Sequence, residues 1–190
     1  MKRRYFILII AVLAISAGIA AQQALQQSSP AAELSFLYTR LAGSASNQYA
    51  AWIEDAQGQY IKTLYATRWS ANGGWRLGEG RRAASIPIWA RQSNIGSRSR
   101  EYVDAISSAT PRTGNVTYTW DGTNSLGLPV PNGEYVLFLE GSLRWENHVL
   151  YRASFNLGQG RSTPVFSINY SGDSITERSM ISDVKLQILR

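Results

Sequence analysis

Two strand-forming segments and the turn-rich connection between them constrain the fold of this chain more than any other feature. Residues 115–120 alternate, with Val116, Tyr118 and Trp120 on one face and polar residues on the other, as in a strand with one solvated face. Residues 135–139 are almost entirely apolar, which is typical of a strand buried on both faces. The two segments therefore predict an edge-facing strand and a central strand of a β-sandwich.

The connection between these segments contains two dipeptides that strongly favour tight turns, Asp121-Gly122 and Asn132-Gly133. The Asp121 side chain is expected to accept a hydrogen bond from the backbone N–H two residues further on, which would fix the turn after Trp120. A calcium loop is the alternative interpretation, but the oxygen ligands here lack the dense spacing of an EF-hand. No metal site is therefore predicted.

Six further segments show strand patterns, and turn signals separate most of them. With the two above, the predicted strands cover residues 34–39, 49–54, 60–65, 115–120, 135–139, 148–157, 165–170 and 184–188. Most of their connections are too short for the crossovers that parallel sheets require. The predicted fold class is therefore all-β, an antiparallel β-sandwich of about eight strands over residues 33–190.

One long insertion, residues 66–114, interrupts the strand pattern and is rich in tryptophan and arginine. We expect it to contain short helical turns, including one over residues 87–92, and to cover one end of the sandwich. Its arginines have two interpretations: a solvated loop face, or a site for phosphate or another anion, whose oxygens match the guanidinium fork. These arginines are Arg68, Arg76, Arg81, Arg82, Arg91, Arg98, Arg100 and Arg112.

The N-terminal residues have the pattern of an export signal. Three basic residues precede an uncharged, mostly apolar run over residues 5–21, and small residues favour cleavage after Ala20. We predict a signal peptide over residues 1–20 and a flexible linker over residues 21–32. An uncleaved membrane anchor is the alternative for the leader. The predicted location is the periplasm or cell envelope, with membrane contact only through an uncleaved leader.

Composition removes several classes of function. The chain has no cysteine, which excludes disulfides, thiolate metal sites and thiol nucleophiles. Its formal charge of +6 falls to +3 without the three basic leader residues, which leaves 16 basic and 13 acidic residues, so nucleic-acid binding is not predicted. His148 is the single histidine, and no catalytic residues are predicted. An electron carrier or a binding module is favoured over an enzyme.

Two stretches of the chain resemble known families. The sequence WDGTNSLGLPVPNGEYVLFLE at residues 120–140 resembles the signature of the immunoglobulin-like (Ig-like) domain of flagellar hook-assembly scaffolding proteins. The sequence YAAWIEDA at residues 49–56, with IKTL following, is similar to a family of predicted periplasmic proteins of unknown function. The resemblance implies an Ig-like sandwich in the envelope, with a turn and a strand pair in the first stretch. It does not imply a flagellar role.

Residues 104–110, DAISSAT, resemble the D-x-x-[ST]-G-A-T motif of exported flavoproteins. In that family a transferase moves FMN from FAD onto the last threonine as a phosphoester. Asp104, Ser107, Ala109 and Thr110 match the motif, whereas a serine stands at its glycine position. The added Cβ restricts a close approach to the backbone at that point. The resemblance implies covalent FMN on Thr110.

The surrounding residues suit this interpretation. Small side chains beside Thr110 leave room for a modifying enzyme, and Arg112 with its neighbouring arginines can balance the charge of a phosphate. The predicted function is an exported periplasmic protein that carries covalent FMN for extracytoplasmic electron transfer, with a flavin transferase and a membrane redox partner. The alternatives are an ordinary Ser/Thr/Pro loop at this position, and a non-catalytic Ig-like binding or assembly module of the envelope.

Overall fold

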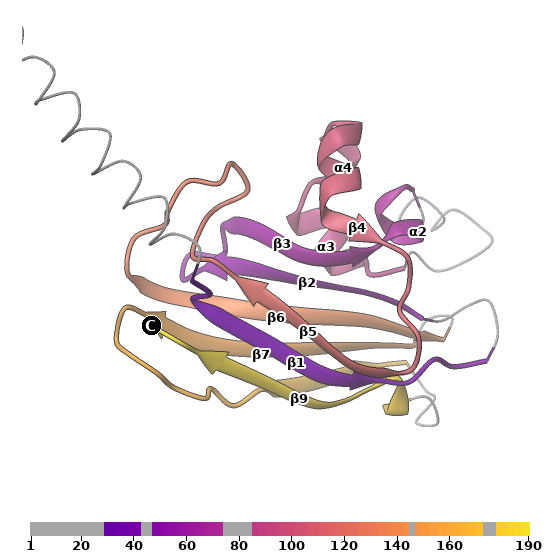
Figure 1. Ribbon diagram of the computed structural model, residues 1–190. Coiled ribbons are helices and arrows are strands. Elements are labelled where there is room, and N and C mark those ends of the chain that lie inside the picture. Colours follow the sequence, from indigo (N-terminus) through magenta and orange to yellow (C-terminus); the bar gives the residue numbers. More distant parts are fainter. Residues whose placement is uncertain (1–28, 43–46, 74–84, 145–146, 173–177) are drawn as a thin grey trace, which may run out of the picture. The chain divides into compact units, whose positions relative to one another are not determined.

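The computed structural model describes residues 29–42, 47–73, 85–144, 147–172 and 178–190. Their strands are β1 (Ala32–Tyr38), β2 (Gln48–Asp55), β3 (Tyr60–Thr67), β4 (Ser107–Ser108), β5 (Gly114–Trp120), β6 (Gly133–Arg144), β7 (Asn147–Leu157), β8 (Ser167–Ser171) and β9 (Ile181–Ile188). Figure 1 shows these strands in two sheets that lie face to face. The first sheet has three antiparallel strands in the order β5-β1-β9. The second has six in the order β4-β3-β2-β6-β7-β8, antiparallel except for the short β3–β4 pair.

The predicted all-β sandwich is confirmed, and each predicted strand coincides with an observed one. β5 is an edge strand of the first sheet and β6 is central in the second, as the two hydrophobicity patterns indicate. The expectation of a strand pair within residues 120–140 was wrong, because β5 and β6 belong to different sheets. Their connection crosses the sandwich, which lets aromatic residues at its two ends meet in the core.

The main core lies between the two sheets, and Trp120 at the end of β5 is fully buried in it. Its ring packs edge-on against Tyr135 and Phe155, with ring centroids 5.3 and 5.9 Å apart. Its indole Nε1 donates to the backbone carbonyl of Thr123 at 2.8 Å, so the one polar atom of the side chain has a partner. Trp120 therefore joins both sheets and the start of the connecting loop.

A group of tyrosines links the edge strand β5 to the second sheet. The hydroxyls of Tyr49 and Tyr118 lie 2.7 Å apart in a hydrogen bond. The Tyr65 ring stacks on Tyr118 with centroids 4.7 Å apart and lies 4.9 Å from the Tyr49 ring. Burial raises the pKa of the Tyr65 hydroxyl, so this group remains a hydrogen-bond donor.

The loop after Trp120 is fixed by Asp121, as predicted. The Asp121 carboxylate accepts from the backbone N–H of Thr123 at 3.1 Å and from its hydroxyl at 2.7 Å. Lys62 adds a salt bridge of 3.0 Å. Burial opposes the charge, but the hydrogen bonds from Thr123 and Lys62 outweigh it and lower the pKa of Asp121. The loop is therefore held to β3 as well as to its own backbone.

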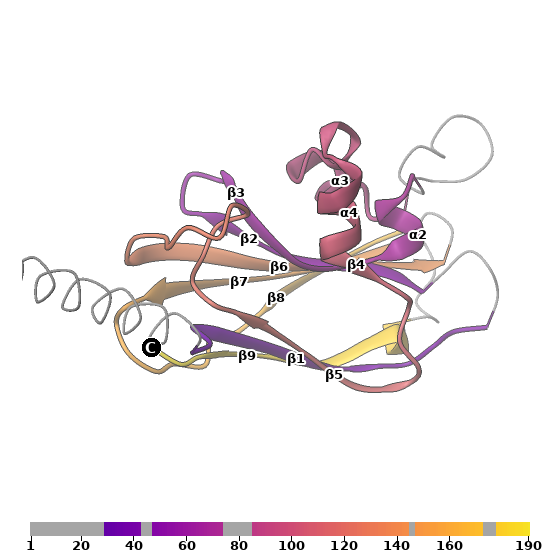
Figure 2. The ribbon, with the colours of Figure 1, turned by 45° about the horizontal axis from the view of Figure 1, so that its top comes forward.

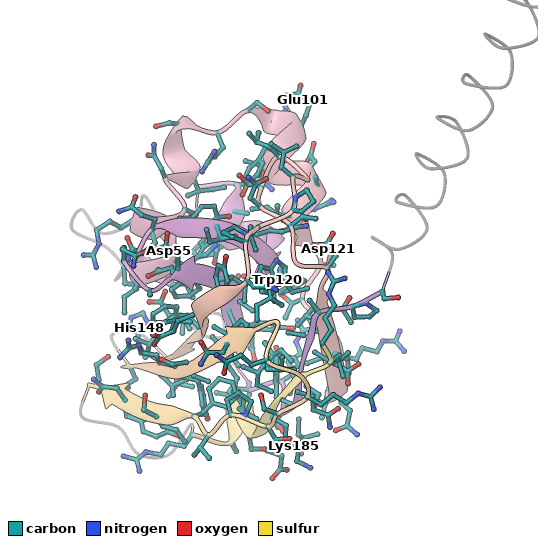
Figure 3. The ribbon with its side chains drawn as sticks, turned by 90° about the vertical axis from the view of Figure 1, so that its left-hand side faces the viewer. Asp55, Glu101, Trp120, Asp121, His148 and Lys185 are labelled. Carbon is teal, nitrogen blue, oxygen red and sulfur yellow. The ribbon has the colours of Figure 1, made fainter. Side chains whose placement is uncertain are left out.

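Both ends of the described sandwich meet at one rim, which Figure 3 faces, with Trp120 and Asp121 labelled. The Ala31 N–H donates to the Trp120 carbonyl at 2.6 Å, and the Leu189 N–H donates to the Ala31 carbonyl at 2.8 Å. The Arg190 guanidinium donates to the Asp121 carbonyl at 2.8 Å. The predicted leader, 1–20, and most of the predicted linker lie outside the described residues.

Short helices of the insertion cover the outer face of the second sheet, as Figure 2 shows above β2 and β3. They are α2 (Arg68–Ala71), α3 (Pro87–Gln92), η2 (Ile95–Ser97) and α4 (Arg100–Ile106), and η3 (Arg178–Met180) precedes β9. The predicted helical turn over residues 87–92 is confirmed. The expectation that the insertion covers an end of the sandwich was wrong, because β2 and β3 carry apolar residues on their outer face that the helices bury.

Gly141 lies on β6 where the core leaves no room for a side chain. A Cβ there would lie 2.7 Å from Ile181 Cδ1, 3.0 Å from Met180 Cε and 3.2 Å from Val149 Cγ1. Gly141→Ala is therefore expected to lower the free energy of unfolding by about 1–3 kcal/mol, measured by urea denaturation. Adding Ile181→Val, which removes the nearest methyl group, should recover part of that loss. A double variant that loses the full sum of both single effects would contradict this packing explanation.

Candidate functional site

A second core fixes the insertion to the sheet. Its buried members are Ala50, Trp52, Ala66, Ala71, Ile86, Trp89, Ile95 and Val103. Trp52 stacks on Phe138 with centroids 5.0 Å apart, and its Nε1 donates to Glu54 at 2.6 Å. Trp89 of α3 is fully buried, and its Nε1 donates to the Thr63 hydroxyl at 2.9 Å. Two indoles thus combine large apolar contact with satisfied N–H groups.

Glu140 of β6 holds α3 in place. Its carboxylate accepts from the backbone N–H of Trp89 at 2.7 Å and from that of Ile88 at 3.1 Å. These are N–H groups of the first turn of α3, which have no partner within the helix. Glu140 is 1% exposed, and burial raises its pKa to about 7, although the two N–H donors and Arg91 act in the opposite direction.

Hydrogen bonds also position α4 against β3. The Tyr60 hydroxyl lies 2.6 Å from the Tyr102 hydroxyl on α4 and 2.6 Å from the Thr63 hydroxyl. Ser99 caps α4, since its side chain accepts from the Tyr102 N–H at 3.2 Å. The last turn of α4 therefore delivers the chain to the edge of the second sheet at a defined place.

The flavinylation-like motif, residues 104–110, begins on α4 and ends beyond β4. Asp104 is exposed on α4, Ser107 is buried at the start of β4, and Ala109 is exposed. Thr110 is partly exposed in the segment that leads to β5. The structure therefore keeps the predicted residues together as one surface segment, with Ser107 as its inward anchor.

The motif backbone is bonded to β3. Ser107 and Ser108 pair in parallel with Ala66 and Thr67, and the Tyr65 hydroxyl donates to the Ala109 carbonyl at 3.2 Å. Ser108, which replaces the motif glycine, is exposed within a strand and does not have positive φ. Extended backbone accepts a Cβ, so this position does not require glycine.

The residues around Thr110 suit a phosphoester. Ser107 Oγ is buried and has no hydrogen-bond partner among the described residues, so it is not accessible to a group at the surface. Arg112, two positions after Thr110, is exposed. Its guanidinium can donate hydrogen bonds to phosphate oxygens.

A pocket of about 340 Å³ opens between α2, η2 and α4. Its lining residues are Ala71, Asn72, Gly73, Ile95, Gly96, Arg98, Arg100 and Val103. Of the arginines considered as an anion site, Arg98 and Arg100 meet here, while Arg68, Arg91 and Arg112 do not line the pocket. Arg76, Arg81 and Arg82 lie outside the described residues. The sequence did not locate this pocket, because α2, η2 and α4 meet only through tertiary packing.

Within the described parts of the chain, no three histidine or acidic side chains gather as metal ligands would. None of the helices in those parts has the length and apolar composition needed to cross a membrane. His148 is the second residue of β7 and pairs with Ser142 of β6, at the opposite end of the strand from Leu157, and it belongs to none of the clusters above.

Comparisons with known proteins give one match. A family model described as "Predicted periplasmic protein (DUF2271)" matches residues 35–172, a span of well over half the chain that includes the motif, the insertion and the pocket. Neither the comparison with curated proteins nor the comparison with solved structures found a match.

Proposed function

This chain belongs to the family of predicted periplasmic proteins, and on that premise we propose that it carries covalent FMN on Thr110 for electron transfer in the periplasm. The observation that carries the proposal is the placement of residues 104–110. Their backbone is bonded to β3, while Asp104, Ser108 and Ala109 face solvent. A modifying enzyme can therefore reach the motif, and the acceptor threonine sits on a fixed edge of the sandwich.

The attachment is a phosphoryl-group transfer that needs FAD and a flavin transferase. The Oγ1 of Thr110 forms a bond to the phosphorus of the FMN half of FAD. The P–O bond to the AMP half breaks, and AMP leaves with that electron pair. The hydroxyl proton passes to a base of the transferase or to water. The Thr110 side chain ends as a phosphoester.

The chain's own residues have a holding role. Arg112, which is exposed, can donate to the phosphoester oxygens, and the Tyr65 hydroxyl fixes the backbone beside Thr110. Bound FMN supplies one- or two-electron chemistry, and a covalent bond prevents its loss by dilution outside the cytoplasm. A membrane redox partner would exchange electrons with it.

The proposal is tested by coexpressing the chain with a flavin transferase and measuring the intact mass. The wild-type protein should gain one FMN less one water and keep its yellow colour and flavin fluorescence after denaturation. Thr110→Val, which keeps the β-branched shape and removes the hydroxyl, should show no adduct at all. Thr117→Val, an exposed threonine of the neighbouring strand β5, is the matched control and should be modified as fully as the wild type.

Two results would overturn the proposal. An unmodified wild-type protein would leave residues 104–110 as an ordinary loop and the chain as a binding or assembly module. An adduct that persists in Thr110→Val would place the flavin elsewhere. Ser108→Gly, which restores the motif glycine, should be modified at least as fast as the wild type, because Ser108 already has extended backbone.

A further inference from the structure

The pocket between α2, η2 and α4 has a mostly polar lining, with a small apolar floor and two arginines at its rim. Ala71, Ile95 and Val103 are buried and form the floor, whereas Arg98 and Arg100 are exposed. Among the described residues that line it there is no carboxylate. A volume of about 340 Å³ is in the range of small-molecule sites.

Arg98 is held in a defined orientation. Its Nε donates to the Ser93 carbonyl at 3.0 Å, and its guanidinium lies 5.0 Å from the Tyr102 ring centroid and 5.6 Å from that of Tyr60. The Nε bond leaves the terminal nitrogens as donors, and the fixed side chain loses little entropy when it binds an anion.

Arg100 is the second cation of the rim. The single salt bridge in the described parts of the chain joins Lys62 to Asp121; Arg100 forms none there, although its charge adds to the hydrogen bonds that lower the pKa of the adjacent Glu101. Beside it, Gly73 and Gly96 present no side chain, which lets a ligand approach the backbone. One held guanidinium and one without a salt bridge thus line a small hollow that is mostly polar and partly apolar.

We propose that this pocket binds a small organic anion in which a phosphate or carboxylate group is joined to an apolar, ring-sized body. The oxyanion meets the donors of Arg98 and Arg100, and the body displaces water from Ala71, Ile95 and Val103. This site does not depend on flavin at Thr110, and its test is therefore made on the Thr110→Val protein.

The probes are phenyl phosphate, benzoate, phenol and inorganic phosphate. Binding of each probe is measured by calorimetry and by changes in the backbone amide NMR shifts of Gly73 and Gly96. Phenyl phosphate or benzoate should bind at least about tenfold more tightly than inorganic phosphate or phenol, since only the first two use both floor and rim. The tighter of the two identifies the oxyanion. Equal affinity for phenyl phosphate and inorganic phosphate, or shifts confined to amides outside the pocket, would overturn the proposal.

Variants then separate the pocket from general positive charge. Arg100→Gln should weaken binding of the tighter probe about tenfold, and Arg100→Lys should recover part of it. Arg161→Gln, an exposed arginine that does not line the pocket, should bind as the parent does. Circular dichroism and thermal unfolding verify that each variant is folded. Unchanged binding in Arg100→Gln, or an equal loss in Arg161→Gln, would exclude the site.

Discussion

Replacing Trp120 with alanine is expected to lower the free energy of unfolding by about 3–5 kcal/mol, the range for a fully buried tryptophan in a core. The variant loses the edge-on contacts with Tyr135 and Phe155 and the Nε1 bond to the Thr123 carbonyl. It leaves a cavity where the two sheets and the connecting loop meet. In a chain of this size the midpoint of thermal unfolding should fall by about 6–20 °C, measured by calorimetry.

Trp120→Phe is the matched control for this prediction. It keeps an aromatic ring between the sheets but loses the hydrogen bond to Thr123 and part of the buried volume. Its expected cost is about 2 kcal/mol. If the alanine and phenylalanine variants were equally destabilised, the hydrogen bond alone would matter. If neither changed the midpoint, Trp120 would not join the sheets as described.

The second large effect is a pH dependence of the free energy of unfolding, which originates at Glu140. Burial raises the pKa of this carboxyl from its ordinary value of 4.5 to about 7. Between these values the folded chain binds a proton that the unfolded chain releases. The resulting stabilisation, on the order of 3 kcal/mol, is therefore complete below pH 4.5 and is lost as the pH rises through 7. Urea denaturation at intervals from pH 5 to pH 8 should show the wild type becoming less stable.

Glu140→Gln should flatten this dependence, because glutamine does not titrate but still offers a carbonyl oxygen to an N–H of α3. Glu134→Gln, an exposed glutamate on the same strand, should leave the slope unchanged. Asp121 does not contribute to the slope between pH 5 and pH 8, since its pKa is lowered and it titrates below this range. Parallel curves for the wild type and Glu140→Gln would show that the slope comes from another group.

Local pattern was enough to predict the strands and the fold class. The alternation at residues 115–120 and the apolar run at 135–139 correctly identified an edge strand and a central strand. Pattern alone did not assign these strands to different sheets, because sheet membership depends on contacts far apart in the sequence. It also did not identify Glu140, whose carboxylate directly follows an apolar run and reads as the polar end of a strand until α3 is placed above it.

The candidate site could be predicted only in part, because local pattern does not report contacts between distant segments. Residues 104–110 are contiguous, so a short motif could be read from the sequence. Their bonding to β3 through Tyr65 and the β4 pairing joins residues some forty positions apart, and no local signal reports such a contact. The pocket at Arg98 and Arg100 depends on three helices whose turns carry little periodicity of their own.

Ala31 and Thr110 lie at opposite rims of the sandwich, and this separation bears on how a redox partner could reach the proposed flavin. Whatever precedes Ala31 joins the fold at one rim, whereas Thr110 lies between β4 and the start of β5, near Gly114, which pairs with Tyr38 at the opposite rim. β1 runs from one rim to the other in 7 residues, or about 23 Å. If Thr110 carries the proposed flavin, the flavin would lie about one strand length from the point where the chain enters β1. Under the proposed function, a partner that exchanges electrons with this flavin would therefore contact the rim opposite Ala31.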